Sequence, residues 1–148
     1  MVNQTKSPKF RTLKSFPKDF MACSEIFEEN MKEKIEENET WEPEKFENNF
    51  KTREIRTIQD KKTKQIIGFF QVQYRKELTY IKNLQIQTQY QNKGIGTQIL
   101  KTIQNEANEK KLPKLKLKIF QNNQSINFYE NFGFRITKKL DSKYIMEL

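Results

Sequence analysis

The amino-terminal part of the chain carries apolar side chains at the spacing of an amphipathic helix. Between residues 18 and 38 they recur with glutamates and lysines between them, at Phe20, Met21, Ile26, Phe27, Met31 and Ile35. Trp41 and Glu42 then break the pattern, and Pro43 suits the first turn of a second, short helix. That helix would carry Phe46 and Phe50 on one side. Two helices are therefore predicted to open the fold.

From Arg53 onward the pattern becomes typical of strands. A strand is expected around residues 55–58, a polar turn at 60–63 and a long β-prone run at 65–74, so that the two strands form a hairpin. A further strand is expected at residues 80–86. Three consecutive strands thus follow the two helices.

The remaining sequence returns to a helix and then to short elements. Residues 96–110 are predicted to be a helix, with an apolar face formed by Ile95, Ile99, Leu100, Ile103 and Ala107. Apolar residues alternate with lysines over residues 114–119, which predicts a strand. A short helix and two last strands are expected at residues 125–131, 134–138 and 143–148. This order of elements predicts an α/β domain with a mixed sheet.

Length and composition narrow the classes of protein that fit the chain. Its 148 residues suit one domain, residues 1–148, and the low hydrophobic content of 34% is offset by 12 phenylalanines. The sequence has no histidine and one cysteine, Cys23, which excludes an internal disulfide and a Ser-His-Asp or Cys-His catalytic group. No metal site is expected, and Cys23 is interpreted as a small buried residue. Since neither a long apolar run nor a secretory signal is found, a cytoplasmic protein without membrane contact is expected.

Charge is distributed unevenly along the chain. The net charge of +9 combines +4 over residues 1–24, −6 over residues 25–54 and +11 over residues 55–148. A basic surface can attract nucleic acid, anionic lipid or a phosphorylated cofactor. A solvated surface without a partner accounts for the same charge, so composition does not choose between these alternatives.

The glycines of the segment 91–97 lie where a loop enters the predicted helix. The first amides of a helix have no internal acceptor, and glycine lets a ligand approach the backbone closely. Together with the helix dipole, such amides form a binding site for a pyrophosphate. The spacing of Gly94 and Gly96 matches neither GxxxxGK[ST] nor GxGxxG. A tight turn at the start of a helix needs the same glycines, and this alternative stays open.

Two motifs over residues 65–148 give this loop a wider context. In the first, a strand triplet is followed by a polar residue and spaced glycines: Leu84-Gln85-Ile86, then Gln91, Gly94 and Gly96. The second consists of Asn122, Ser125, Phe128-Tyr129 and Gly133-Phe134. In this order, with a helix and a strand between them, the motifs resemble those of the GNAT superfamily of acetyl-CoA-dependent N-acetyltransferases. Ser125 departs mildly from the alanine that is usual there.

The resemblance implies a fold and a set of binding residues. The fold would be α/β (α+β), GNAT-like: a mixed, mostly antiparallel central sheet with helices on both faces and a splayed pair of parallel strands. Backbone groups would hold the pyrophosphate of acetyl-CoA at Gln91, Asn92, Lys93, Gly94, Ile95, Gly96 and Thr97. The pantetheine arm would pair with the strand end at Leu84, Gln85 and Ile86. Asn122 would bind the arm or the neighbouring loop, with the adjacent Asn123 as an open alternative.

The resemblance also implies a reaction. A primary amine of a small molecule or peptide would attack the thioester directly, in a ternary complex. A backbone N–H near Ile86 would stabilise the developing oxyanion, and Tyr129 would protonate the leaving thiolate. Without its motif, Tyr129 would be interpreted as a core tyrosine. No general base is assigned: Glu54 and Glu77 lie at strand ends, and a water relay is an equal alternative. Whether the chain forms a homodimer is left open.

Other interpretations compete with this one. The basic segment 55–148 carries aromatic residues on strands and would suit a non-enzymatic nucleic-acid-binding sheet, with Phe69, Phe70, Tyr74 and Phe120 as stacking rings. Phe69 and Phe70 lie on opposite faces, however, which argues against such a platform. A third reading is a GNAT fold that binds an acyl-CoA without turnover. The acidic segment 25–47 also raises the hypothesis of an acceptor entrance that favours cationic amines, although a solvated helix surface is the simpler explanation.

Overall fold

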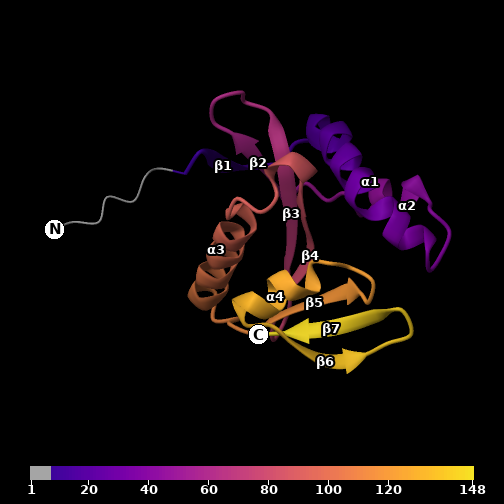
Figure 1. Ribbon diagram of the computed structural model, residues 1–148. Coiled ribbons are helices and arrows are strands. Elements are labelled where there is room, and N and C mark those ends of the chain that lie inside the picture. The colour runs from indigo at the N-terminus through magenta and orange to yellow at the C-terminus, as the bar shows by residue number, and fades with distance from the viewer. Residues whose placement is uncertain (1–7) are drawn as a thin grey trace.

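Seven strands form one sheet in the computed structural model, which describes residues 8–148 (Figure 1). The strands are β1 (Phe10–Lys14), β2 (Ile55–Asp60), β3 (Ile66–Tyr74), β4 (Thr79–Ile86), β5 (Leu115–Phe120), β6 (Arg135–Lys139) and β7 (Lys143–Glu147). The helices are η1 (Pro17–Asp19), α1 (Phe20–Glu36), α2 (Pro43–Asn49), η2 (Thr88–Tyr90), α3 (Ile95–Glu109) and α4 (Ile126–Phe132). The order across the sheet is β1-β2-β3-β4-β5-β7-β6, with β4 and β5 parallel and the other neighbours antiparallel.

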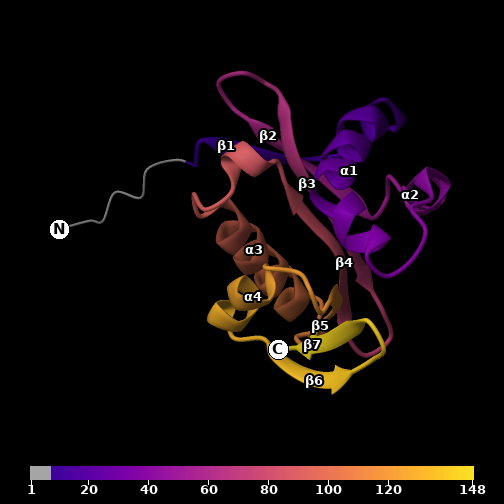
Figure 2. The ribbon, with the colours of Figure 1, turned by 45° about the vertical axis from the view of Figure 1, so that its right-hand side comes forward.

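Helices cover both faces of this sheet (Figures 1 and 2). The adjacent side chains of Phe69 and Phe70 on β3 point to opposite faces, because side chains alternate along a strand. Phe70 packs in a core with residues of α3 and α4, and Phe69 packs in a second core with residues of α1 and α2. Both rings are fully buried. None of the helices in residues 8–148 is long and apolar enough to span a bilayer.

The sheet opens between its two parallel strands. β4 and β5 pair only at their first residues, Thr79 with Leu115 and Tyr80 with Lys116. On its other side β4 has one extra residue relative to β3, because Gln71 pairs with Asn83 and Val72 with Ile81. Such a bulge bends the strand that contains it. The carboxyl-terminal halves of β4 and β5 therefore diverge, and the backbone of β4 lacks a neighbouring strand on that side.

The predicted fold class is confirmed, with one strand missed. The helices, the hairpin, the mixed sheet and the splayed parallel pair all occur close to their expected ranges. The prediction contained no strand at residues 10–14, which form β1 at the edge of the sheet. This strand contributes no clear alternation, because only Phe10 of its residues packs against the core. Its position is set by pairing with β2, which lies more than forty residues further along the chain.

An ion pair ties α3 to the sheet. The Arg56 guanidinium on β2 donates to both carboxylate oxygens of Glu106 at 2.6 and 2.7 Å, and it lies 4.5 Å over the Phe70 ring. The hydrogen bond from Arg56 holds the pKa of Glu106 below its usual value. A carboxyl group whose pKa is depressed by folding stabilises the fold only while it is ionised. This contribution is therefore present at neutral pH and is lost as the pH falls through the folded pKa.

Replacing Glu106 with Gln should lower the free energy of unfolding by about 1 kcal/mol at neutral pH, and by less at acidic pH. Urea denaturation at both pH values measures the difference. Glu109→Gln is the matched control, because Glu109 is exposed on the same helix and forms no ion pair within residues 8–148. An equal loss for Glu106→Gln at both pH values would contradict the assigned cause.

Candidate active site

Six consecutive backbone amides at the start of α3 lack a hydrogen-bond acceptor among the described residues. These are the N–H groups of residues 92–97, and the first bond of the helix runs from the Gln98 amide to the Gly94 carbonyl at 3.1 Å. The backbone is left-handed at Asn92 (φ 61°) and Gly94 (φ 85°), which turns the loop into the helix. Apart from Gly94 itself and the residues next to it in the chain, no described atom lies within 4 Å of the point where a Gly94 side chain would begin. The loop therefore presents donors to open space, as an anion site requires.

Two cavities meet where β4 leaves β5. The first, of about 490 Å³, lies beside the glycine loop, the end of β4 and α1. The second, of about 350 Å³, lies between the helices α1 and α2 and the diverging strands. The cavities share six lining residues, which are Met31, Leu84, Gln85, Asn123, Ser125 and Tyr129. A ligand held at the glycine loop can therefore extend past Tyr129 into the second cavity.

Most of the predicted site residues border the first cavity. Nine line it: Leu84, Gln85, Ile86, Gln91, Asn92, Gly94, Gly96, Thr97 and Tyr129. Three do not. The Ile95 side chain is buried in the core and anchors the loop. The Lys93 ammonium lies 5.6 Å from the centre of the Tyr90 ring. The exposed Asn122 donates a hydrogen bond to the Glu37 carboxylate.

Asn123, the open alternative to Asn122, lines both cavities. Its side-chain oxygen accepts a hydrogen bond from the Ser125 amide at 2.8 Å, which fixes the turn that leads into α4. Of the two asparagines, Asn123 is thus the one that can reach a ligand in the cavities.

The Ile86 carbonyl at the end of β4 is occupied by side chains. It accepts hydrogen bonds from Asn30 Nδ2 at 3.0 Å and from Gln91 Nε2 at 2.8 Å. Gln91 therefore ties the glycine loop to β4 through its side chain, in addition to its backbone position in the loop. Because the backbone groups of successive residues point to alternate sides of a strand, Leu84, two residues before Ile86, is the other residue of the triplet whose backbone faces the gap left by β5.

Tyr129 sits in α4 with its ring in the core. The ring packs edge-on against Phe128 and Phe134, with centroids 5.1 and 5.5 Å apart. No described residue forms a side-chain hydrogen bond with its hydroxyl, yet no buried side-chain oxygen in residues 8–148 lacks a partner. The hydroxyl therefore reaches the open space of the cavities that it lines. Burial raises the pKa of the phenol above its usual value, so it stays protonated at neutral pH.

A chain of side-chain amides crosses the sheet and ends in the cavities. The buried Gln71 donates to the Asn49 carbonyl at 3.0 Å and to the Glu54 carboxylate at 2.8 Å. Its oxygen accepts from Asn83 at 3.1 Å. Asn83 in turn accepts from Gln85 at 3.3 Å, and Gln85 accepts from Asn30 at 3.2 Å. Every amide donates toward the carboxylate, which accepts only when ionised, and the main-chain carbonyls of Asn49 and Ile86 accept from Gln71 and Asn30 in the same sense.

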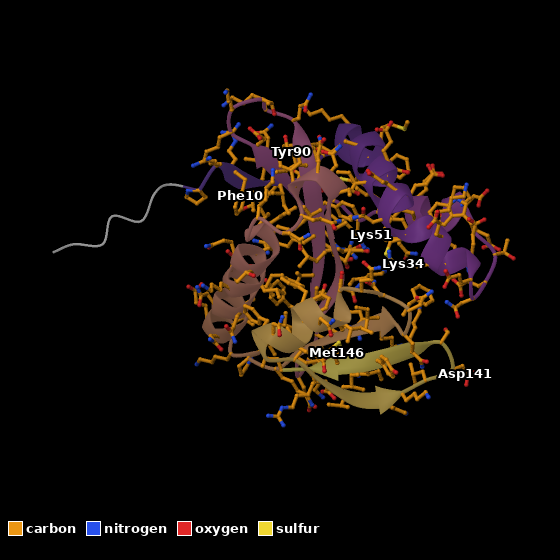
Figure 3. The ribbon with its side chains drawn as sticks, viewed as in Figure 1. Phe10, Lys34, Lys51, Tyr90, Asp141 and Met146 are labelled. Atoms are coloured by element: carbon orange, nitrogen blue, oxygen red, sulfur yellow. The ribbon has the colours of Figure 1, made fainter. Side chains whose placement is uncertain are left out.

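The lining of the cavities differs from the sequence prediction in two respects, the candidate general bases and the residues of α1. Neither Glu54 nor Glu77 lines the two cavities. Asn30 and Lys34 on α1 do line the first one, and Figure 3 labels Lys34 on this helix. Neither was predicted as a site residue. Asn30 follows Ile26 and Phe27 at helical spacing, so a polar residue within an apolar stripe was the available signal.

A family model of the acetyltransferase (GNAT) domain matches residues 23–143 of the chain. The chain belongs to the GNAT family. The match covers most of α1 together with α2, the glycine loop and α4, and it includes every residue that lines the two cavities. No curated protein sequence matches significantly.

Solved structures share the GNAT fold at low sequence identity. The PaiA N-acetyltransferase from Thermoplasma acidophilum in complex with coenzyme A has a TM-score of 0.76 at 18% identity, over 93% of this chain and 97% of that one. Ard1 from Thermoplasma volcanium gives 0.75 at 15% identity, over 95% and 97%. The ribosomal-protein-S18-alanine N-acetyltransferase from Escherichia coli gives 0.73 at 19% identity, over 94% and 92%. These likenesses support the fold.

The second cavity of this GNAT domain has a basic rim. Four lysines line it, Lys45, Lys82, Lys118 and Lys143, against two glutamates, Glu39 and Glu42. Glu42 is already paired with Lys45 at 3.5 Å. The other glutamates of the acidic segment 25–47 are exposed and do not line this cavity. The hypothesis of an entrance for cationic amines therefore receives no support from the charges around the cavity.

Burial decides two further sequence interpretations. Phe69, Phe70 and Phe120 are buried, which leaves Tyr74 as the one exposed ring of the four proposed for base stacking. The GNAT domain therefore lacks that stacking platform in its described part. Cys23 is fully buried, as expected, and burial followed by the nearby Asp19 carboxylate raises the pKa of its thiol to about 12. A thiol that stays protonated is a poor nucleophile.

Proposed function

We propose that the chain acts as a single-domain N-acetyltransferase, which transfers the acetyl group of acetyl-CoA to a primary amine of a small molecule or peptide. The observation that carries this proposal is the run of amides without acceptors at residues 92–97, beside a cavity that leads to Tyr129. A helix amino terminus of this kind binds pyrophosphate through hydrogen bonds and the helix dipole. The coenzyme A complex of the Thermoplasma acidophilum relative supports the same ligand.

In this proposal different residues bind different parts of acetyl-CoA. The amides of residues 92–97 bind the pyrophosphate, and the unpaired edge of β4 at Leu84 bonds the pantetheine arm as a neighbouring strand would. Lys34, whose ammonium is 2.9 Å from the Asn30 carbonyl, adds positive charge at the first cavity. Asn123, and not Asn122, forms the hydrogen bond with the pantetheine arm.

The proposed chemistry places the acceptor amine in the second cavity. The neutral amine attacks the thioester carbonyl directly, a backbone N–H of the β4 edge donates to the developing oxyanion, and the amine releases its proton to water. The thiolate leaves and takes a proton from the Tyr129 hydroxyl. A buried phenol is a weak acid, but a thiolate formed in the same dry space is destabilised as well, so burial changes the balance of the proton transfer little. The Tyr129 phenolate then regains a proton from water, which has taken up the proton of the amine.

Ligand-induced thermal stabilisation tests the first half of the proposal. Acetyl-CoA at a hundredfold excess over its dissociation constant should raise the melting temperature by roughly 5–10 °C. A panel of amines, with release of free thiol as readout, then tests transfer. An unchanged melting temperature would refute the proposal. Stabilisation without transfer to any amine would instead favour an acyl-CoA binder without turnover.

A further inference from the structure

One face of the sheet beyond the second cavity gathers five cationic side chains. Residues that are paired across neighbouring strands lie on the same face. Lys118 on β5 pairs with Ile145 on β7, which pairs with Lys138 on β6. The other pairings of β5, β6 and β7 place further cations on the same face. We call this surface the basic face, and it consists of Lys116, Lys118, Arg135, Lys138 and Lys143. All five side chains are exposed or half-exposed.

The opposite face of these strands belongs to the core. There Leu117 pairs with Met146, and Ile119 pairs with Tyr144. These residues pack with α3 and α4. Lys139 pairs with Tyr144 and therefore lies on this opposite face, although it directly follows Lys138. Lys138 and Lys139 therefore lie on opposite faces of the sheet, so that variants of each can be compared.

The basic face has little negative charge of its own. Within residues 8–148, none of its five cations has a carboxylate within salt-bridge distance. Glu147, the acidic residue that shares the face, is paired with Lys114 at 2.9 Å. Clustered cations without counter-charges repel one another and attract an anionic partner.

The basic face continues into the second cavity. Lys118 and Lys143 belong to both, and the Lys143 ammonium lies 4.7 Å over the ring of Phe120, another lining residue. The α1–α2 connection and the β6–β7 turn lie on the same side of the molecule in both ribbon views (Figures 1 and 2), and Asp141 marks that turn in Figure 3. An acceptor that enters the cavity there passes along the lysines.

We propose that the basic face binds the carboxylates of an acidic polypeptide segment whose amino group enters the second cavity. This inference rests on the proposed acetyltransferase function and adds the class of acceptor. A polypeptide is favoured over a nucleic acid because it supplies an aliphatic amine and because the basic face offers no exposed aromatic ring for base stacking. It is favoured over a small amine because Lys116, Arg135 and Lys138 lie outside the cavity lining and would then have no ligand.

Two labelled peptides test the inference by fluorescence anisotropy and by thiol release. Both have a free amino terminus, followed by glutamates in one peptide and by glutamines in the other. The protein should bind and acetylate the glutamate peptide about tenfold better, since each exposed ion pair is worth roughly a factor of two and several act together. Lys118→Glu/Lys138→Glu should abolish this preference. The matched control Lys61→Glu/Lys139→Glu changes the net charge equally, away from the basic face, and should retain it.

The possible outcomes distinguish failure of the acidic-acceptor proposal from failure of the proposed acetyltransferase function. Equal use of both peptides, equal effects of the two double variants, or tight binding of an oligonucleotide with no peptide preference would each overturn the acidic acceptor. Thermal stabilisation by acetyl-CoA would in those cases still hold, because it does not involve the basic face. Loss of that stabilisation in the unmodified protein would refute the proposed function itself.

Discussion

Replacing Tyr129 with Phe should lower kcat on the order of a hundredfold and leave the affinity for acetyl-CoA almost unchanged. The substitution removes only the hydroxyl, which reaches the cavities, and retains the ring that packs against Phe128 and Phe134. Without the hydroxyl the thiolate must leave unprotonated or wait for water. Thiol release measures kcat, and calorimetric titration with acetyl-CoA measures the affinity.

Tyr144→Phe is the matched control for this substitution. Tyr144 also contacts the core that includes α3 and α4, but it lines neither cavity. Its loss should leave kcat within about twofold. If Tyr129→Phe behaved like Tyr144→Phe, Tyr129 would be a packing residue and the acid would have to be sought elsewhere. Because burial raises the pKa of the Tyr129 phenol, loss of rate through its ionisation is expected only at strongly alkaline pH.

The second large effect is expected at the glycine loop, where Gly96→Val should weaken acetyl-CoA binding on the order of a hundredfold. A Cβ atom at this position would lie 2.8 Å from Phe128 Cζ and 3.5 Å from Ile86 Cδ1. The branched side chain must therefore displace the Phe128 ring, which itself lines the first cavity. Either the loop shifts away from its observed geometry or the ring moves into the space of the ligand.

Gly133→Ala is the control for Gly96→Val, and the affinity of both variants for acetyl-CoA is measured by calorimetry. Gly133 ends α4 at φ 124°, and a Cβ atom there would meet Leu148 Cδ1 at 3.1 Å, so alanine brings strain of about 1 kcal/mol or more. The residue lines neither cavity. Both variants should lose stability, whereas only Gly96→Val should lose affinity. A parallel loss of affinity in Gly133→Ala would indicate that global destabilisation, and not the loop, is responsible.

Local patterns predicted most of the fold because its long helices and most of its central strands carry apolar residues at a regular spacing, whereas the short helices η1 and η2 do not and were not predicted. The lysine alternation that gives β5 and the apolar face that gives α3 are visible in the sequence alone. β1 was missed because its strand character comes from pairing with the distant β2. The bulge at the middle of β4 was likewise invisible, since it depends on the register with β3.

The site was predicted unevenly for a related reason. The glycine loop and Tyr129 belong to motifs that are contiguous in sequence, so their residues were found together. Asn30 and Lys34 reach the first cavity from α1, which precedes the loop by more than fifty residues, and only the folded arrangement brings them there. The choice between Asn122 and Asn123 also required coordinates, because a turn decides which of two adjacent side chains faces inward.

The row of hydrogen-bonded amides that begins at Glu54 links a carboxylate outside the cavities to Gln85 and Asn30, which line them. An isolated row of Gln and Asn side chains can run in either direction, because rotating every amide by half a turn restores all the bonds. A carboxylate at one terminus removes this degeneracy. The main-chain carbonyls of Asn49 and Ile86, which accept from Gln71 and Asn30, favour the same direction. Glu54→Gln would therefore preserve size and polarity and weaken, without abolishing, the preference for the observed direction at Gln85 and Asn30. A carboxylate that lines neither cavity thus helps to orient two of the amide side chains that do.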